Sequence, residues 1–224
     1  MPDLPSQTRI DLDRIASCGV VPVIRIERPD DAPDLARALA GAGLTCLEIT
    51  FRTGAAAEAI AAVRATQPDV LVGAGTVLSM AQLDQASEAG ASFIVSPGFQ
   101  PDVVQACIER GTPVLPGVLT PSEILAALDL GLTQLKLFPA ASAGGPAYLR
   151  TLAGPFPDVR FMPTGGIGAD DLEAYLRVPA VFAVGGSWMV QPGLLAAREW
   201  DEVARLAAEA VAVVRAVRSS AVPR

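Results

Sequence analysis

The stretch TCLEITFRTGAAAEAIAAVRATQPDVLVGAGT, residues 45–76, decides the fold of this chain. It begins with a short apolar run at 45–51 and ends with another at 70–76, and a helix-like segment lies between them at 55–66. Strands that are apolar along their length are typical of a parallel sheet buried on both faces by helices. The stretch therefore predicts a strand–helix–strand unit.

The same alternation of apolar runs and helix-like segments continues on both sides of this unit. Further β-rich runs are VVPVIRI (20–26), SFIVS (92–96), PVLPGV (113–118), TQLKLF (133–138), RFMPTG (160–165) and AVFAVGG (180–186). Helix-like segments lie at 30–42, 80–89, 102–110, 121–128, 146–152, 169–176 and 198–217. Eight such units in 224 residues predict an α/β chain folded as a (β/α)8 TIM barrel.

One domain is expected over residues 1–224, with the barrel at about 20–217. No linker, charge block or low-complexity tract divides the sequence. The segment at about 6–18 predicts an extra N-terminal helix across the bottom of the barrel. An open doubly wound sheet is the alternative, but no G-x-G-x-x-G motif follows the first strand.

Composition excludes several classes of protein. The chain is 51% hydrophobic and 18% charged, which excludes disorder. Its net charge of −7 makes nucleic acid and anionic membranes poor partners. The first twenty residues carry no secretory signal, and prolines and glycines interrupt the uncharged run at 178–197. We therefore expect a cytoplasmic protein that neither enters membranes nor binds nucleic acid.

The rarest residue types restrict the chemistry. The chain has no histidine, which removes Ser-His-Asp and Cys-His nucleophilic arrangements and histidine-liganded metal sites. Its three cysteines, Cys18, Cys46 and Cys107, show no C-x-x-C spacing. We interpret them as reduced core residues and predict no metal site.

Lys136 is the only lysine, whereas the other sixteen basic residues are arginine. Arginine keeps its proton in proteins, but a buried lysine can lose its proton and attack a carbonyl. Strand alternation places Lys136 with Gln134 and Phe138 on one face, which we expect to point into the barrel. The catalytic interpretation is a Schiff-base lysine with a depressed pKa. The alternative is a structural ion pair in an arginine-biased chain.

Glu48 is the predicted partner of Lys136. Alternation places Glu48 on the inner face of its strand with Cys46, Thr50 and Arg52. A carboxylate on this face requires a partner, and without histidine it is the best candidate for moving protons. A structural pair with Lys136 or Arg52 is the alternative.

Cations and glycines at the strand ends predict anion binding. Arg52 lies at the carboxyl end of its strand, where barrel active sites form, and suits a carboxylate; it is alternatively a surface residue. Arg25 is a second possible cation. Strand seven ends in Pro163-Thr164-Gly165-Gly166-Ile167 and strand eight in Gly185-Gly186-Ser187. Barrels often bind phosphate between these loops, next to the start of a short helix, where glycines let backbone N–H groups approach the anion.

These segments closely resemble the 2-keto-3-deoxy-6-phosphogluconate (KDPG) aldolase family, whose members are class I aldolases on a (β/α)8 barrel. The resemblance runs in order over nearly the whole chain. It rests on VVPVI (20–24), LEITFRT (47–53), VGAGTVL (72–78), SPG (96–98), KLFPA (136–140), GPF–VRF–PTGGI (154–167) and VGGSW (184–188).

The resemblance implies a role for each matching residue. Lys136 would form the Schiff base and Glu48 would act as general acid and base. The pyruvate carboxylate and the pocket around it would involve Arg52, Thr76, Pro97, Phe138 and Thr164. The phosphate would lie on Gly165, Gly166, Gly185, Gly186 and Ser187. Ala141, in the expected pocket wall, departs from the pattern, since relatives often carry glutamate there.

The implied activity is cleavage of KDPG to pyruvate and glyceraldehyde 3-phosphate, without metal or other cofactor, in a homotrimer. Three alternatives stay open: a 4-hydroxy-2-oxoglutarate aldolase, a phosphate-binding isomerase or synthase, and a silent ligand-binding barrel. The sequence leaves the preferred C4 epimer, gluconate or galactonate series, undecided.

Overall fold

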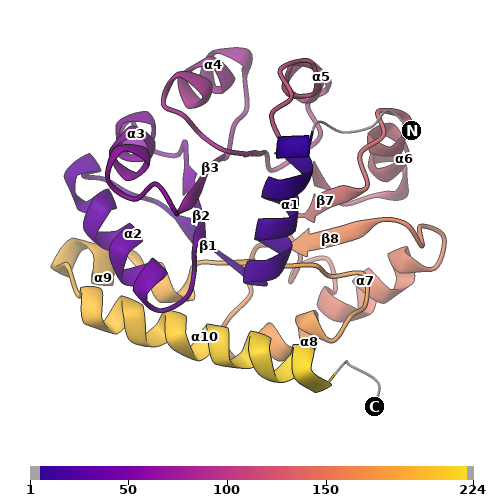
Figure 1. The fold of residues 1–224 in the computed structure, drawn as a ribbon. Coiled ribbons are helices and arrows are strands. Elements are labelled where there is room, and N and C mark those ends of the chain that lie inside the picture. The colour runs from indigo at the N-terminus through magenta and orange to yellow at the C-terminus, as the bar shows by residue number, and fades with distance from the viewer. Residues whose placement is uncertain (1–5, 221–224) are drawn as a thin grey trace.

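Parallel strands lie at the centre of the molecule and helices surround them (Figure 1). The structure, a computed structural model, describes residues 6–220, so the expectations for residues 1–5 and 221–224 lie outside it. The strands are β1 Val20–Ile24, β2 Cys46–Thr50, β3 Leu71–Gly75, β4 Ile94–Val95, β5 Val114–Leu115, β6 Gly117–Val118, β7 Gln134–Leu137, β8 Arg160–Pro163 and β9 Val184–Gly186.

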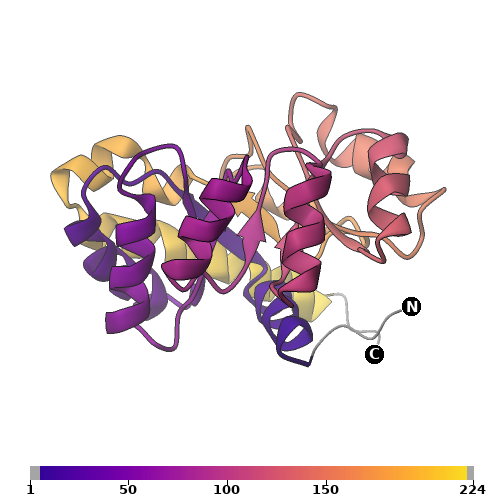
Figure 2. The same cartoon turned by 90° about the horizontal axis from the view of Figure 1, so that it is seen from above.

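Helices alternate with strands along most of the chain, beginning with α1 before β1. They are α1 Ser6–Cys18, α2 Ala32–Gly41, α3 Ala56–Thr66, α4 Met80–Glu88, α5 Pro101–Glu109, α6 Pro121–Asp129, α7 Gly145–Ala153, α8 Leu172–Leu176, α9 Pro192–Ala197 and α10 Trp200–Ser220, with 3-10 turns η1 Pro29–Asp31 and η2 Trp188–Val190. Seen from above, α3 to α6 stand in a row outside the strands, in purple to rose (Figure 2).

The strands form two parallel sheets. One has six strands in the order β5-β4-β3-β2-β1-β9, and the other has three in the order β6-β7-β8. Every pairing between these strands is parallel. The predicted parallel α/β fold is therefore confirmed.

The two sheets meet at two places. Pro116 separates β5 from β6, and its carbonyl accepts a hydrogen bond of 3.0 Å from the Lys136 backbone N–H. At the other side, isolated parallel bridges join Phe161 to Val181 and Thr164 to Gly185. Proline has no N–H to donate to a ladder, so it divides the fifth strand into two short pieces.

The predicted helix at 6–18 is confirmed as α1, and it lies across one end of the strands (Figure 1). Leu12 and Ile15 of α1 belong to one apolar cluster with inward-facing residues of the strands. That cluster contains Val21, Cys46, Leu71, Phe93, Val95, Leu115, Met162, Phe182 and Ala183. Since helix α1 covers the amino ends of the strands, the carboxyl ends remain for the loops of the candidate site.

The opposite faces of the strands pack on the helices. Leu47 and Ile49 of β2, and Leu135 and Leu137 of β7, are buried in the larger cluster that joins strands and helices. Their neighbours Cys46 and Glu48, or Lys136, lie on the other face. The face assignment predicted for these two strands is therefore confirmed, because side chains alternate along a strand.

Some predicted boundaries were wrong. The run at 180–186 forms a strand only at Val184–Gly186, and the segment at 169–176 is helical only over Leu172–Leu176. Helix α9 was not predicted as separate from α10, and Arg198, which follows α9, has a left-handed φ of 55°. Glycines and a proline near these positions shorten the regular elements.

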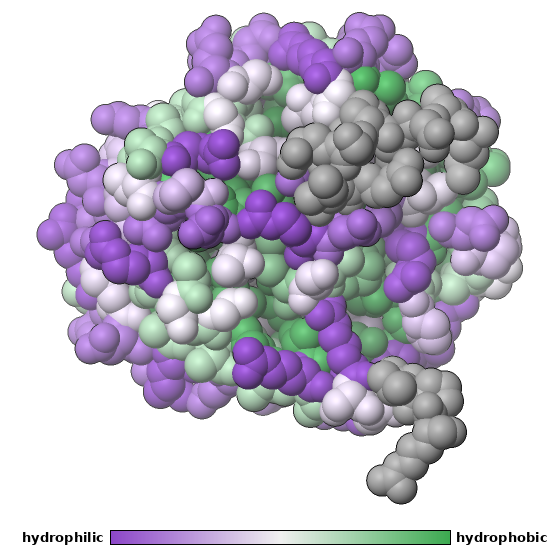
Figure 3. Space-filling model, in the orientation of Figure 1, coloured by the Kyte–Doolittle hydropathy of each residue, from purple (hydrophilic) through white to green (hydrophobic). Residues whose placement is uncertain are grey.

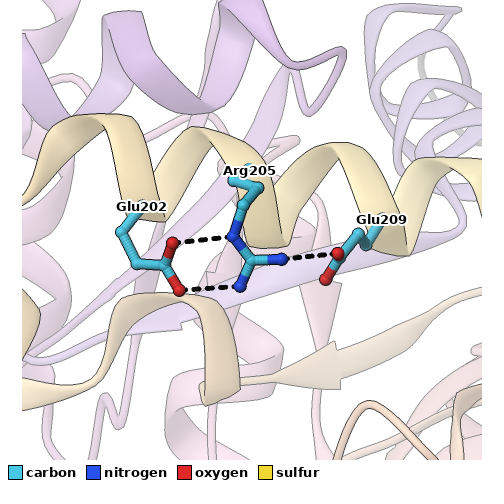
Figure 4. Close-up of polar contacts among 3 residues, drawn as sticks. All are labelled: Glu202, Arg205 and Glu209. Carbon is cyan, nitrogen blue, oxygen red and sulfur yellow. Dashed lines mark hydrogen bonds and ion pairs between the residues drawn. The ribbon is translucent and has the colours of Figure 1, made fainter.

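Helix α10 is amphipathic and closes the arrangement against α2 and α8. Its buried side is Val203, Ala207, Ala210, Val214 and Val217. On its exposed side Arg205 bridges Glu202 and Glu209, with N···O distances of 2.7 and 2.5 Å (Figure 4). The hydrogen bond from Arg205 holds the pKa of Glu202 below its usual range. Such pairs one turn apart stabilise a helix.

No helix within residues 6–220 is both long and apolar enough to cross a bilayer.

Candidate active site

Lys136 and Glu48 meet in the interior between the two sheets. The Nζ atom of Lys136 lies 3.5 Å from Oε1 of Glu48, and the two side chains are 5% and 0% exposed. They come from β7 and β2, which are far apart in sequence. No ion pair joins Glu48 to Arg52 within the described part of the chain. The predicted pairing of Glu48 with Lys136 is therefore the one that the structure contains.

The Glu48 carboxylate is poorly satisfied. Both of its oxygens are buried and accept no hydrogen bond from the residues that the structure describes. A buried carboxylate normally accepts several hydrogen bonds, because desolvation without them is unfavourable. Its oxygens are thus free to accept a hydrogen bond from a substrate hydroxyl or a water molecule.

Gly75 of β3 makes room for this carboxylate. A Cβ at residue 75 would stand 2.0 Å from Oε1 of Glu48, which is far inside contact distance. In the β2–β3 register, Gly75 pairs with Thr50 and Gly73 pairs with Glu48. Sequence patterns did not identify Gly75 as a site residue; its signal was the glycine in GAGT directly before Thr76.

Phe138 and Gly165 lie on one side of the lysine. The ring centroid of Phe138 is 5.4 Å from Nζ of Lys136, within reach of a cation–π contact when the amine is charged. A Cβ at Gly165 would stand 3.0 Å from the Phe138 ring, and Gly165 has a left-handed φ of 99°. The structure therefore brings Lys136, Phe138 and Gly165 together.

Pro97 is connected to the lysine through Gly117. A Cβ at residue 117 would stand 2.3 Å from the carbonyl of Pro97, so these backbones touch. Gly117 is also the register partner of Lys136 in the β6–β7 ladder. Pro97 thus lies beside the strand that neighbours Lys136.

Arg52 and Thr76 follow the carboxyl ends of β2 and β3. Arg52 is exposed, and its guanidinium makes no ion pair with the residues described. Thr76 has a left-handed φ of 56°, which is uncommon for a threonine. No hydrogen bond or ion pair joins either side chain to Lys136 or Glu48 among the described residues. Arg25, the second possible cation, is half-exposed and pairs with Glu27 at 2.9 Å.

The glycine loops lie at the ends of β8 and β9. Gly165 and Gly166 both have left-handed φ, at 99° and 74°. The side chain of Thr164 is buried against Gly185. A Cβ at residue 185 would stand 2.3 Å from Oγ1 of Thr164. Gly186 is covered by the Trp188 ring, and Ser187 is exposed directly before η2.

The short helix expected next to the glycine loops is found after one of them. Ser187 immediately precedes η2, but α8 begins at Leu172, six residues beyond Gly166. The intervening loop is held by a 3.1 Å hydrogen bond from the Gly168 N–H to Asp171. No group of three or more histidine, cysteine or carboxylate residues capable of holding a metal occurs in residues 6–220.

A buried primary amine beside an unsatisfied carboxylate, inside a parallel α/β fold, is typical of a carbon–carbon lyase that works through a Schiff base. The family model for KDPG and KHG aldolase matches residues 12–206. A 2-dehydro-3-deoxy-phosphogluconate aldolase of Treponema pallidum is 49% identical over 195 residues, covering 87% of this chain and 93% of the relative. The chain belongs to the KDPG and KHG aldolase family, and aldolases are carbon–carbon lyases.

Solved structures agree with this assignment. A KDPG aldolase of Legionella pneumophila, with pyruvate captured as a covalent carbinolamine intermediate, is 39% identical with a TM-score of 0.85 over 88% of this chain and 96% of that one. A KDPG aldolase of Zymomonas mobilis with 3-phosphoglycerate is 41% identical with a TM-score of 0.84, over 92% and 96%. The family resemblance seen in the sequence is thereby confirmed.

Proposed function

We propose that this chain is a class I aldolase that cleaves KDPG to pyruvate and glyceraldehyde 3-phosphate, with Lys136 as the Schiff-base lysine. The observation that carries the proposal is the buried contact of 3.5 Å between Lys136 and Glu48, whose two oxygens have no hydrogen-bond donor in the described structure. Carbonyl substrates and lysine amines form Schiff bases when the amine is uncharged and held in place.

The first half of the reaction forms the iminium. The neutral Lys136 amine adds to the C2 carbonyl of the keto acid and gives a carbinolamine. Glu48 donates a proton to the carbinolamine hydroxyl, which leaves as water, and an iminium remains. The Legionella relative that holds pyruvate as a covalent carbinolamine supports this step.

The second half breaks the carbon–carbon bond. Glu48 removes the proton of the C4 hydroxyl, the C3–C4 bond breaks, and its electron pair moves into the iminium to give an enamine. Glyceraldehyde 3-phosphate leaves with C4 as its aldehyde carbon. The enamine is then protonated at C3, and water hydrolyses the iminium to pyruvate and the free amine. The iminium is the electron sink, so this scheme uses no metal or other cofactor.

The two anionic ends of the substrate would bind at the carboxyl ends of the strands. Arg52 and Thr76 would hold the pyruvate carboxylate, next to a pocket wall of Pro97, Phe138 and Thr164. The left-handed turns at Gly165 and Gly166, together with Gly185, Gly186 and Ser187, would receive the phosphate. The phosphorylated acid in the Zymomonas relative supports a phosphate site.

We also propose that the two sheets close into one (β/α)8 barrel with α1 across its amino end, as a single domain over residues 1–224. The Lys136–Pro116 hydrogen bond and the bridges at Phe161–Val181 and Thr164–Gly185 support closure. Homotrimeric assembly is a proposal from the family resemblance, and a cytoplasmic location is a proposal from the composition and cysteine usage of the sequence.

Borohydride trapping tests the proposed function. Incubation with pyruvate and sodium borohydride should add one reduced pyruvyl group, and peptide mass spectrometry should locate it on Lys136. Lys136→Arg keeps the charge but should lose both the adduct and KDPG cleavage. A phosphate-binding isomerase or synthase would gain no adduct. A silent barrel would not exchange the methyl protons of pyruvate in deuterium oxide.

Cleavage of 4-hydroxy-2-oxoglutarate to pyruvate and glyoxylate is the second candidate, because the matching family model includes KHG aldolases. Ser187→Ala separates the two substrates. If Ser187 donates to the phosphate, kcat/KM for KDPG should fall by about tenfold, which corresponds to one hydrogen bond to a charged group. The value for 4-hydroxy-2-oxoglutarate should stay unchanged.

A further inference from the structure

Two cysteines that are far apart in sequence lie together at the amino end of the strands. Cys18 is the last residue of α1, and Cys46 is the first residue of β2. Cys46 is fully buried in the apolar cluster beneath α1, and Cys18 packs against the same cluster but is partly exposed. Both are free thiols. The prediction that all three cysteines are core residues is therefore wrong for Cys18, because it ends the helix at the molecular surface.

A surface pocket of about 440 Å³ gives access to Cys18. The pocket lies between α1 and α10, on the face of the molecule shown in Figure 3. It is lined by Arg14, Ser17, Cys18, Gly43, Thr45, Val211, Val214, Arg215 and Arg218. Solvent and small reagents can thus approach the Cys18 sulfur, whereas Cys46 is fully buried and does not line the pocket.

Arginines make this pocket positive in a chain of net charge −7. Arg14 donates to the Asp69 carbonyl at 2.6 Å, and Arg218 donates to the Ser17 carbonyl at 2.5 Å. Arg215 makes no ion pair or side-chain hydrogen bond with the described residues. These guanidinium groups should attract an anionic reagent to the pocket.

The two thiols differ in their protonation. A hydrogen bond from the Cys46 thiol lowers the pKa of Cys18 to about 6. The Thr45 hydroxyl, 3.5 Å from the Cys18 sulfur, acts in the same direction. The same contact with Cys18, together with burial, raises the pKa of Cys46. At neutral pH these shifts favour the thiolate at the partly exposed Cys18 and the protonated thiol at the buried Cys46. By contrast, burial raises the pKa of Cys107 to about 12.

We propose that Cys18 and Cys46 form a redox-active thiol pair, which a peroxide converts into an intramolecular disulfide between α1 and β2. The Cys18 thiolate attacks one peroxide oxygen, the O–O bond breaks, and a sulfenic acid forms as the other oxygen leaves as hydroxide or alkoxide. The Cys46 sulfur then attacks the sulfenic sulfur, and its proton leaves with the hydroxyl group as water. The two thiols lose two electrons and two protons, and the peroxide takes them up.

The proposal places a covalent tie between two elements that are already in contact. The sulfur atoms must approach to about 2.05 Å, which requires α1 to shift on the strands. A disulfide closes a loop of the unfolded chain and thereby lowers its conformational entropy. Oxidation should therefore raise the thermal unfolding midpoint, and a reducing agent should reverse the change.

The first experiment uses the full-length wild-type protein. After removal of reductant, a few equivalents of hydrogen peroxide are added and the mass is followed under non-reducing conditions. The expected product has lost two hydrogen atoms, and tryptic peptides 15–25 and 38–52 are linked. Oxidation of Cys18 to sulfinic acid without this link, or oxidation of Cys107 as fast as Cys18, would overturn the proposal.

Single substitutions separate the two roles. In Cys46→Ser the Cys18 sulfenic acid should persist and react with dimedone, whereas in Cys18→Ser the buried Cys46 should stay reduced. Cys107→Ser is the matched control and should form the link at the wild-type rate. If Cys18→Ser still loses two hydrogen atoms, the assignment is wrong.

The effect of the positive charge in the pocket is tested separately. A dianionic aromatic disulfide should react with Cys18 severalfold more slowly in Arg215→Gln, while a neutral dipyridyl disulfide should react at an unchanged rate. Equal slowing of both reagents would show that the substitution altered access rather than charge, and would contradict the role of the arginines.

Discussion

Gly75 and Glu48 occupy neighbouring strands so closely that a Cβ on Gly75 would stand 2.0 Å from the carboxylate oxygen. That oxygen is the one that faces the Lys136 amine at 3.5 Å. The absence of a side chain at residue 75 thus fixes where the carboxylate can lie, and the position of the carboxylate fixes its distance from the amine.

Gly75→Ala should displace Glu48 and reduce kcat for pyruvate release by about 100-fold, the order of magnitude of a lost general acid–base group. The substitution should also lower the free energy of unfolding by about 1–3 kcal/mol, because it overpacks the interior. Gly54→Ala is the control, since a Cβ at residue 54 would meet nothing within 4 Å. Wild-type kcat in Gly75→Ala would contradict the proposed role of Glu48.

Glu48→Gln should separate proton transfer from Schiff-base formation. The amide keeps the shape of the side chain but cannot accept a proton, so kcat should fall by about 10²–10⁴-fold. The lysine remains in place, and borohydride with pyruvate should still yield a Lys136 adduct after long incubation. Complete loss of the adduct in a folded variant would show that Glu48 instead holds the lysine in position.

Gly185→Ala and Thr164→Ala should be coupled. A Cβ at Gly185 would stand 2.3 Å from Oγ1 of Thr164, so Gly185→Ala alone should lower the free energy of unfolding by about 1–3 kcal/mol. Removal of the threonine hydroxyl and methyl relieves this clash, and the double variant should be less destabilised than the sum of the single variants. Urea unfolding of the four proteins measures the coupling, and strict additivity would contradict it.

Alkylation of Cys18 should depend on pH with a midpoint near 6, because its pKa is lowered to about 6 and only the thiolate reacts. The rate with iodoacetamide should therefore rise from pH 5 to pH 7 and then level off, whereas an ordinary thiol with a pKa of about 8.5 would still be gaining reactivity. Cys107 is buried and should remain unmodified at these pH values. A midpoint above about 8 would contradict the environment described for Cys18.

Ile15→Ala tests whether α1 belongs to the core. Ile15 is 0% exposed in the cluster at the amino ends of the strands, so its truncation should lower the free energy of unfolding by about 2–5 kcal/mol. Leu125→Ala, at a residue that is 54% exposed, should change it by less than about 0.5 kcal/mol. Equal effects of the two substitutions in chemical denaturation would show that α1 is only loosely attached.

Much of the arrangement follows from local patterns in the sequence. Alternation along β2 and β7 predicted that the side chains of Glu48 and Lys136 point away from the helices, because the leucines and isoleucine on either side of them pack on the helices. Parallel strands place their carboxyl ends at one edge, and this predicted where Arg52 and the glycine loops lie. These inferences need only the period of a strand and its direction.

Other features depend on contacts that no local pattern encodes. Gly75 lies against Glu48 and Gly117 lies beside Lys136 because neighbouring strands approach closely there, whereas a glycine in a strand can equally mark a bulge or a tight bend. Cys18 and Cys46 meet only because α1 folds back over the strands, so their spacing in the sequence carried no signal. The short length of β9 and α8 likewise depends on the tertiary packing around their glycines.

Pro116 marks a weak point in the hydrogen bonding between the two sheets. The ladder of hydrogen bonds is interrupted where β5 ends and β6 begins, and the carbonyl at that break is what tethers the main chain of Lys136. Local opening between the two sheets at Pro116 would move the Lys136 amine away from the Glu48 carboxylate, while most of the helices stayed intact. On heating, turnover should consequently fade before circular dichroism registers any loss of helix.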